Sequence, residues 1–331
     1  MLRPIQVRQL LNYMRTQGFS AGEVLAGSRI DESRLLDQSY LVEPGQCHAV
    51  VAKVIQLTAN PGVGLLIGGA TKLQDIGIVG YGMASSHTLG QAIGLWLQYA
   101  NSPIGFPFSL QALPQPGAGR WGVWASATGV SDPVFRYYME ASLAMGMRLA
   151  SVLTGKRLQI LNVEFSYPAP PHWRQYERLF KCPIRFDRPV TRAVGRASNL
   201  ELLIKSNDNE LRELCVRHCA QIVRQISRLG TVSARLRSTL TTMGAIPALD
   251  AAAVALHMSA RSLRRSLQNE RTSFQQVLDE FRKDLAQEYL GAGMMQTKEV
   301  AHLLGYSQVD AFRRAFKAWT GQTVGEFLAA C

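Results

Sequence analysis

Two similar segments near the C-terminal end constrain the fold of this chain more than any other feature. Each has an alanine, three further residues, a turn position, one residue and a serine, followed by two large apolar residues four positions apart. The first runs from Ala253 to Leu267 and the second from Ala301 to Phe316, so that the two alanines lie 48 positions apart. This spacing predicts a short helix, a tight turn and a second helix in each segment, which is the helix-turn-helix pattern.

The residue types fit that geometry. An alanine is small enough to let the two helices of a unit cross closely. The turn position needs a positive φ angle, which Gly305 adopts without strain and which His257 adopts less comfortably. Ser259 and Ser307 are suited to cap the second helices. The apolar pairs that we expect to anchor those helices are Leu263 with Leu267 and Phe312 with Phe316.

The predicted outward faces of the two second helices are basic and polar. Arginine can donate two hydrogen bonds to a guanine edge, and arginine or lysine can bind phosphate. Such a face can also be simply solvated, but inside a doubled helix-turn-helix it predicts contact with double-stranded DNA. The candidate DNA-binding residues are Arg261, Ser262, Arg264, Arg265 and Gln268 in the first unit, and Gln308, Val309, Asp310, Arg313, Arg314 and Lys317 in the second.

A single helix is predicted between the two units, over residues 273–290. At 1.5 Å per residue its 18 residues span about 27 Å. Successive major grooves on one face of DNA lie about 34–36 Å apart. One chain could therefore place both second helices in adjacent major grooves and read a bipartite site.

These segments resemble the AraC/XylS family of transcription regulators. The resemblance covers about 80 residues, and several spaced elements agree in order. It implies a promoter-binding regulator, often an activator that contacts RNA polymerase, which needs no cofactor and is not an enzyme. The matching elements are 258–267, Ser273-Phe274, Arg282, Ala286, Leu290, 301–307, 311–316 and 319–321.

The chain departs from the family pattern at a few positions. Ala260 and Val324 stand where proline is frequent, and Leu328 stands where a closing arginine is common. Asp310 replaces a small or amide residue and would repel phosphate. It could accept a hydrogen bond from a cytosine amino group, cap its helix, or pair with Arg314.

The first two thirds of the chain predict an α+β domain, joined to an all-α C-terminal domain with two helix-turn-helix units. Asp132 and Pro133 are suited to begin a long helix that continues to about Leu153. Other helices are predicted at 1–18, 46–58 and 88–101, and strands at 108–113, 120–128, 158–165 and within 183–204.

A weaker resemblance, carried by residues 75–86 and 88–90, covers about residues 20–205. It is to the sensor domain of one subgroup of AraC-type regulators, labelled arabinose-binding by analogy. The resemblance implies a domain that responds to a small-molecule effector without naming it. Six aromatic residues could line an effector cavity or belong to an ordinary core; they are Trp96, Tyr99, Phe106, Phe108, Trp121 and Trp124.

Residues 209–229 form a clear predicted helix that Gly230 should end. Its apolar residues have coiled-coil-like spacing, which favours a homodimer through this helix but also permits packing on its own domain. Thr231 to Pro247 is predicted to be a polar linker. The predicted organisation is an effector and dimerisation domain at 1–230, a linker at 231–247 and a DNA-binding domain at 248–331. The apolar positions of the helix are Leu211, Cys215, Cys219, Ile222, Ile226 and Leu229.

The formal net charge of +12 favours a polyanionic partner. The excess is greatest in residues 180–235, with 11 Lys/Arg against 5 Asp/Glu, so that a regulator acting mainly by docking an acidic protein is the alternative. Five scattered cysteines, including Cys331, argue against a disulfide scaffold. No apolar run is long enough to span a membrane, and we expect a cytoplasmic protein.

Three other groupings offer chemistry in principle. Glycines 62–69 superficially resemble a dinucleotide loop, but the preceding strand and the later acidic residue are missing, so close helix packing or turns are favoured. Cys215, His218 and Cys219 lie within one helical turn but lack a fourth metal ligand. His87 follows two serines without a placed acid, which is a weak catalytic grouping.

Overall fold

The computed structural model describes residues 2–37, 39–113, 118–126, 130–229, 231–243, 246–291 and 295–330. The chain divides into two compact units, Met1–Val223 and Arg224–Cys331. Gly230, the expected helix stop, and Cys331 lie outside the described residues, as does the end of the strand expected at 120–128.

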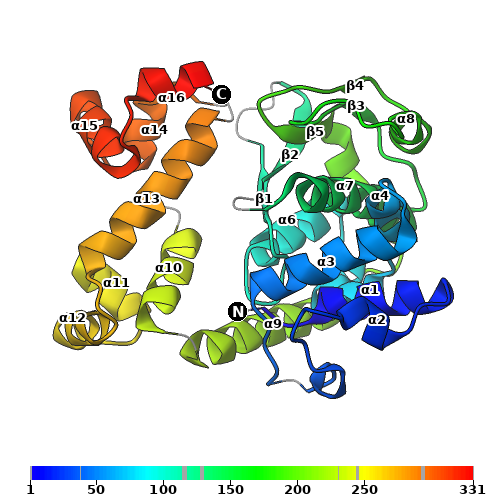
Figure 1. The fold of residues 1–331 in the computed structure, drawn as a ribbon, viewed down its shortest axis with the longest axis horizontal. Helices are drawn as coiled ribbons and strands as arrows, with labels where there is room; N and C mark the ends of the chain where they lie inside the picture. The colour runs from blue at the N-terminus through cyan, green and yellow to red at the C-terminus, as the bar shows by residue number, and fades with distance from the viewer. Residues whose placement is uncertain are drawn as a thin grey trace. The chain divides into compact units, whose positions relative to one another are not determined.

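A five-stranded sheet forms the centre of the first unit (Figure 1). Its order is β1-β2-β5-β3-β4, and every pairing is antiparallel except that of β3 with β4. Alternating burial along β2 reflects the alternation of side chains between the two faces of a strand. The strands, all within predicted segments, are β1 (Ser109–Ala112), β2 (Arg120–Ser126), β3 (Ile160–Glu164), β4 (Ile184–Arg185) and β5 (Thr191–Arg196).

Helices pack against this sheet, and the mixed α/β architecture predicted for the N-terminal domain is confirmed. The longest is α7 (Asp132–Thr154). Ser131, and not Asp132, occupies its cap position without a side-chain hydrogen bond, and the Asp132 carboxylate pairs with Arg136 at 2.8 Å. The others are α1 (Ile5–Thr16), α2 (Ala21–Leu25), α3 (Pro44–Thr58), α4 (Val63–Ala70), α5 (Ile78–Ala84), α6 (Leu89–Ala100), α8 (Arg174–Phe180) and α9 (Asn209–Leu229), with short 3₁₀ turns at Glu32–Arg34, Leu73–Ile76 and Ala197–Glu201.

The glycine-rich tract is a helix-packing surface. A Cβ atom at Gly68 would lie 2.3 Å from the carbonyl oxygen of Ala141, and one at Gly64 would lie 2.7 Å from that of Tyr137. These glycines let α4 approach α7 more closely than any side chain would permit. The packing interpretation is confirmed for both positions.

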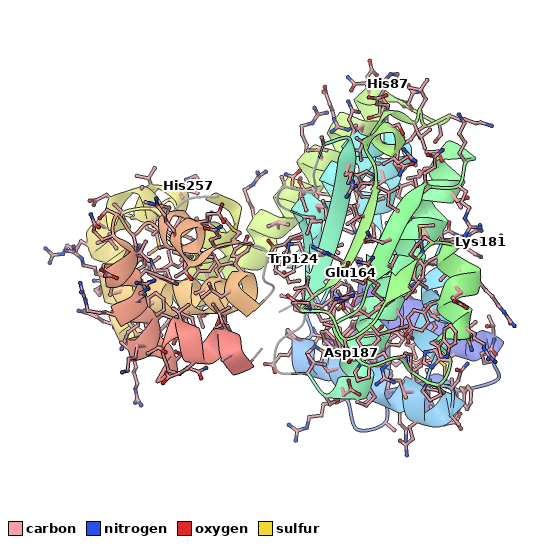
Figure 2. All side chains as sticks on the ribbon, turned by 90° about the horizontal axis from the view of Figure 1, so that it is seen from above. His87, Trp124, Glu164, Lys181, Asp187 and His257 are labelled. Atoms are coloured by element: carbon pink, nitrogen blue, oxygen red, sulfur yellow. The ribbon has the colours of Figure 1, made fainter. Side chains whose placement is uncertain are left out.

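A cross-strand row of polar contacts marks one face of the sheet. Trp124 of β2 is paired in register with Arg192 of β5, whose Nε donates to Glu164 of β3 at 2.7 Å. Figure 2 labels Trp124 and Glu164 on these strands. Because side chains alternate, Trp121 and Val123 project from the opposite face, against which α7 packs around a cavity.

The second unit is entirely helical where it is described, as predicted. Two apolar clusters form its core, one around Leu263 and Leu267 and the other around Phe312 and Phe316. Its helices are α10 (Val232–Met243), α11 (Leu249–Ala255), α12 (Ala260–Asn269), α13 (Phe274–Gly291), α14 (Thr297–Leu303), α15 (Val309–Thr320) and α16 (Val324–Ala330).

The predicted linker at 231–247 is wrong over most of its length, because α10 occupies it. Leu236 and Leu240 are four positions apart and bury fully in the first apolar cluster. Arg237 pairs with Glu280 and Asp284 of α13. Serine and threonine are frequent in this stretch of the sequence, which gives it a linker-like composition.

Four of the six apolar positions predicted for the seam of α9 are already buried in the single chain, whereas the first, Leu211, is exposed. Cys215, Cys219, Ile222 and Ile226 are each at most 6% exposed. A Cβ atom at Gly82 of α5 would lie 3.2 Å from the Cβ of Cys215, so this part of the seam packs on the first unit.

No single helix within the described residues is long and apolar enough to cross a membrane. The α3–α4 pair meets that test only jointly, across a bend of 110°.

Candidate DNA-binding surface

The two predicted turns have the same backbone geometry. His257 has a φ of 55° and Gly305 a φ of 81°, as the spacing predicted. The N–H of His257 donates to the carbonyl of Val254 at 2.9 Å, and that of Gly305 donates to His302 at 3.0 Å. The following N–H groups return to Ala253 and Ala301, both at 2.9 Å. These bonds satisfy carbonyls at the ends of α11 and α14 and fix both turns in one conformation.

The second helices of the two helix-turn-helix segments, α12 and α15, begin differently. Ser259 caps α12, and its hydroxyl accepts a hydrogen bond from the N–H of Ser262 at 3.1 Å. The expected cap at Ser307 is wrong, because α15 begins one residue later, with Gln308 in the cap position and no side-chain hydrogen bond. Helix α12 therefore has a capping hydrogen bond at its N-terminus that α15 lacks.

Small and large apolar residues hold each helix-turn-helix segment together as predicted. Ala253 and Ala301 are at most 1% exposed, so a larger side chain would push the paired helices apart. The anchor residues Leu263, Leu267, Phe312 and Phe316 are fully buried. Burying these faces turns the opposite faces of α12 and α15 outward.

Two arginines that the sequence analysis did not assign to this role fix the turns to neighbouring helices. Arg235 of α10 donates to the carbonyl of Leu256 at 3.2 Å, and Arg282 of α13 donates to that of Leu304 at 3.1 Å. Arg282 also stacks over the ring of Tyr306, 5.1 Å from its centre. The two carbonyls occupy equivalent places in the two units, so each turn is held by a similar contact. Nothing in the doubled motif itself predicts that an arginine from another helix holds each turn.

The candidate residues form two exposed, largely basic faces. All of them are exposed except Val309, which is half-buried. On α12, Arg261, Arg264 and Arg265 have no ion-pair partner among the described residues, and the helix contains no acid. Three free guanidinium groups on one helix are available to phosphates or guanine edges.

The α15 face is partly neutralised. Asp310 pairs with Arg313 at 3.1 Å, and not with Arg314 as the sequence analysis suggested. The i, i+3 spacing brings these two side chains together on the helix surface. Arg314 and Lys317 are exposed, with no ion pair in the described part of the chain. The two recognition helices thus differ in charge although their turns are alike.

Helix α13 connects the two helix-turn-helix segments, as predicted. It spans 18 residues, and Ser273, just before it, accepts a hydrogen bond from the N–H of Gln276. Its first half packs in one apolar cluster through Val277, Leu278 and Phe281, and its second half packs in the other through Ala286 and Leu290. Figure 1 shows α11–α12 and α14–α15 at opposite ends of α13, and Figure 2 labels His257 at the first turn.

The other candidate groupings do not converge. Cys215 and Cys219 are buried, burial raises the pKa of both thiols, and His218 is exposed. The Ser86 hydroxyl donates to the carbonyl of Gly82. The described residues hold no cluster of three or more potential metal ligands. The basic segment 180–235 is distributed over β4, β5, α9 and the start of α10.

Comparisons with known families assign both units. The model of the arabinose-binding domain of AraC transcription regulators, N-terminal, matches residues 18–203, and a helix-turn-helix domain model matches residues 252–330. A DNA-binding helical domain behind an α/β domain of this type defines a transcription regulator. The chain belongs to the AraC family of transcription regulators.

Two relatives found by sequence agree with that assignment. The chain is 32% identical over 275 residues to the ornithine utilization regulator of Pseudomonas aeruginosa. The alignment covers 83% of this chain and 80% of that protein. It is 25% identical to an uncharacterized HTH-type transcriptional regulator of Mycobacterium tuberculosis, over 97% of this chain and 94% of that one. The crystal structure of the transcriptional regulator CdpR from Pseudomonas aeruginosa covers 98% of each chain, with 22% identity and a TM-score of 0.49.

Proposed function

We propose that this regulator reads a bipartite promoter site by placing α12 and α15 in adjacent major grooves of one duplex. The observation that carries the proposal is the repetition of one turn geometry at both ends of α13. Each copy is followed by a helix whose outward face bears arginines. Arg261, Ser262, Arg264, Arg265 and Gln268 would contact one half-site, and Gln308, Val309, Asp310, Arg313, Arg314 and Lys317 the other.

The base-reading role of individual arginines is testable on a site selected from random DNA. Arg264→Ala and Arg314→Ala are each expected to weaken binding to that site by about 1–3 kcal/mol while changing binding to random DNA much less. Arg174→Ala, in the first unit, is the matched control. Equal losses on both DNAs would show that the arginine contacts phosphate only, and no loss on either would remove it from the interface.

We further propose that the active regulator is a homodimer that responds to an effector bound by the first unit and contacts RNA polymerase. The seam of α9 is buried within the chain from Cys215 to Ile226, so a dimer contact would use the part of α9 that remains exposed, which includes the first seam residue, Leu211. Leu211 and Leu214 are 42% and 56% exposed. Sedimentation over a range of concentrations tests the dimer, and a mass that stays at one chain would exclude it.

The domain organisation that we propose differs from the expected one in the position of α10. The effector and dimerisation domain comprises the first unit with α9. The DNA-binding domain includes α10, because Leu236 and Leu240 complete the core beneath α12. A fragment that begins at residue 248 would lose this core contact.

A further inference from the structure

A cavity lies in the first unit between the inner face of the sheet and α7. Trp121 and Val123 of β2 and Ala193 of β5 form its floor, and Gly146 and Ala150 of α7 face them. Helices α5 and α6 close one side with Met83, Leu89, Ile93 and Trp96. The space open to the centre of a water-sized molecule is about 50 Å³, several times the roughly 10–15 Å³ that one water needs.

The lining is almost entirely apolar. Ser142 is the one hydroxyl-bearing side chain among the residues that line this cavity, and its hydroxyl already donates to the carbonyl of Met139 at 3.1 Å. The indole N–H groups of Trp96 and Trp121 have no hydrogen-bond partner among the described residues and could serve at most two hydroxyl groups of a sugar. Its other hydroxyl groups would be buried without partners, which is unfavourable. A hydrocarbon chain or ring would gain contacts on every side. The name of the matching domain family therefore does not fit the chemistry of this cavity.

The helices on one side of the cavity are joined to α9. Next to Met83, Gly82 packs against Cys215 of α9, and the hydroxyl of Tyr99, one turn after Trp96, donates to the carbonyl of Val216 at 3.3 Å. Further contacts tie the end of α5 to the start of α9, including the N–H of Asp208 and the carbonyl of Ser85 at 3.0 Å. Helix α9 continues into the second unit, which begins at Arg224.

We propose that this cavity is the effector site, that it takes a small molecule with a hydrocarbon body rather than a sugar, and that filling it acts on DNA binding through α5, α6 and α9. The inference rests on the effector-responsive regulator proposed above. The ligand separates α7 from the sheet and presses on α5 and α6. These helices pass the displacement to α9 because their contacts with it are direct.

The first test measures ligand binding to the full chain without DNA. Toluene, octan-1-ol and L-arabinose are titrated by calorimetry, and tryptophan fluorescence is followed because Trp96 and Trp121 line the cavity. Saturable binding of toluene or octan-1-ol is expected, with none of arabinose. Ala193→Leu fills the cavity and should weaken binding at least tenfold, and Ala150→Leu, from the opposite wall, should do the same. The exposed Val152→Leu on α7 should leave binding unchanged.

The second test measures the affinity for selected DNA with and without saturating toluene. A change of threefold or more is expected in the parent chain and in Val152→Leu, and none in a filled variant whose circular dichroism matches the parent. Arabinose binding in place of toluene, equal toluene binding by filled and parent chains, or toluene binding without a change in DNA affinity would each overturn the proposal. Loss of all DNA binding would instead refute the proposed function, since the first test uses no DNA.

Discussion

At the scale of single residues, charge distinguishes two helices that are otherwise built alike. The arginines of α12 are unpaired among the described residues, whereas Asp310 holds Arg313 on α15. In a helix-turn-helix the N-terminal residues of the recognition helix contact base edges. Asp310, in the first turn of α15, would therefore face the DNA, where it would repel phosphates and disfavour bases that present no hydrogen-bond donor to it. We infer that α12 contributes more affinity and α15 more discrimination.

Asp310→Asn tests that division of roles. It removes the repulsion and frees Arg313, so binding to random DNA should strengthen and its dependence on salt should steepen by about one phosphate contact. The ratio of specific to random affinity should fall. Measuring both affinities across a salt series checks this, with the exposed Glu201→Gln in the first unit as a control of equal charge change. Unchanged affinities and slope would place Asp310 away from the DNA.

Residue-level expectations succeeded where local geometry dictates the answer. The positive φ of His257 followed from its place in the repeat, and the burial of Ala253 and Phe316 followed from spacing. The partner of Asp310 did not, because the i+3 and i+4 neighbours are both arginines and rotamers decide between them. The cap at Ser307 also failed, since the start of a helix shifts by a residue at little cost.

At the scale of elements, the composition of α10 fails to predict that this segment is a helix packed in the core. Its sequence is rich in serine and threonine, yet two leucines one turn apart suffice to dock it. Its N-terminus is capped from a distance, because the Glu270 carboxylate accepts hydrogen bonds from the N–H groups of Val232 and Ser233. Burial alone would raise the pKa of Glu270, but these bonds outweigh it and lower that pKa. A contact between residues 37 or more positions apart leaves no local signal in the sequence.

The cap on α10 predicts a pH-dependent stability. Because the pKa of Glu270 is lower in the folded state, its contribution is complete above the unfolded pKa of about 4.3 and is lost as pH falls through the folded value. Glu270→Gln should destabilise the first helix-turn-helix by about 1 kcal/mol at pH 7 and remove this acid sensitivity. Hydrogen exchange at the amides of Val232 and Ser233 measures it, and unchanged protection in the variant would contradict the capping role.

At the scale of the whole molecule, the doubled motif was sufficient to predict a helical DNA-binding domain of the AraC family, and the helix and strand patterns of the first two thirds of the chain predicted the α/β domain before it. The seam of α9 was less decisive, because the same apolar spacing suits a partner chain or the chain's own α5, and only tertiary packing chooses between them. The cavity of the first unit could be predicted only as one of two alternatives for its aromatic residues, not in its position or lining. Its walls come from eight strands and helices far apart in sequence. The sequence alone could not distinguish Trp96 and Trp121 from ordinary core residues.

The central claim is that α13 holds α12 and α15 of one chain in neighbouring major grooves. The spacing of the half-sites tests this claim most directly. Footprints are compared on a selected site and on the same site with 5 base pairs inserted between its halves, about half a helical turn. We predict two protected segments one turn apart on the parent site. On the lengthened site, protection should retreat to one half, with at least a tenfold loss of affinity. Full protection of both halves with undiminished affinity would contradict the account.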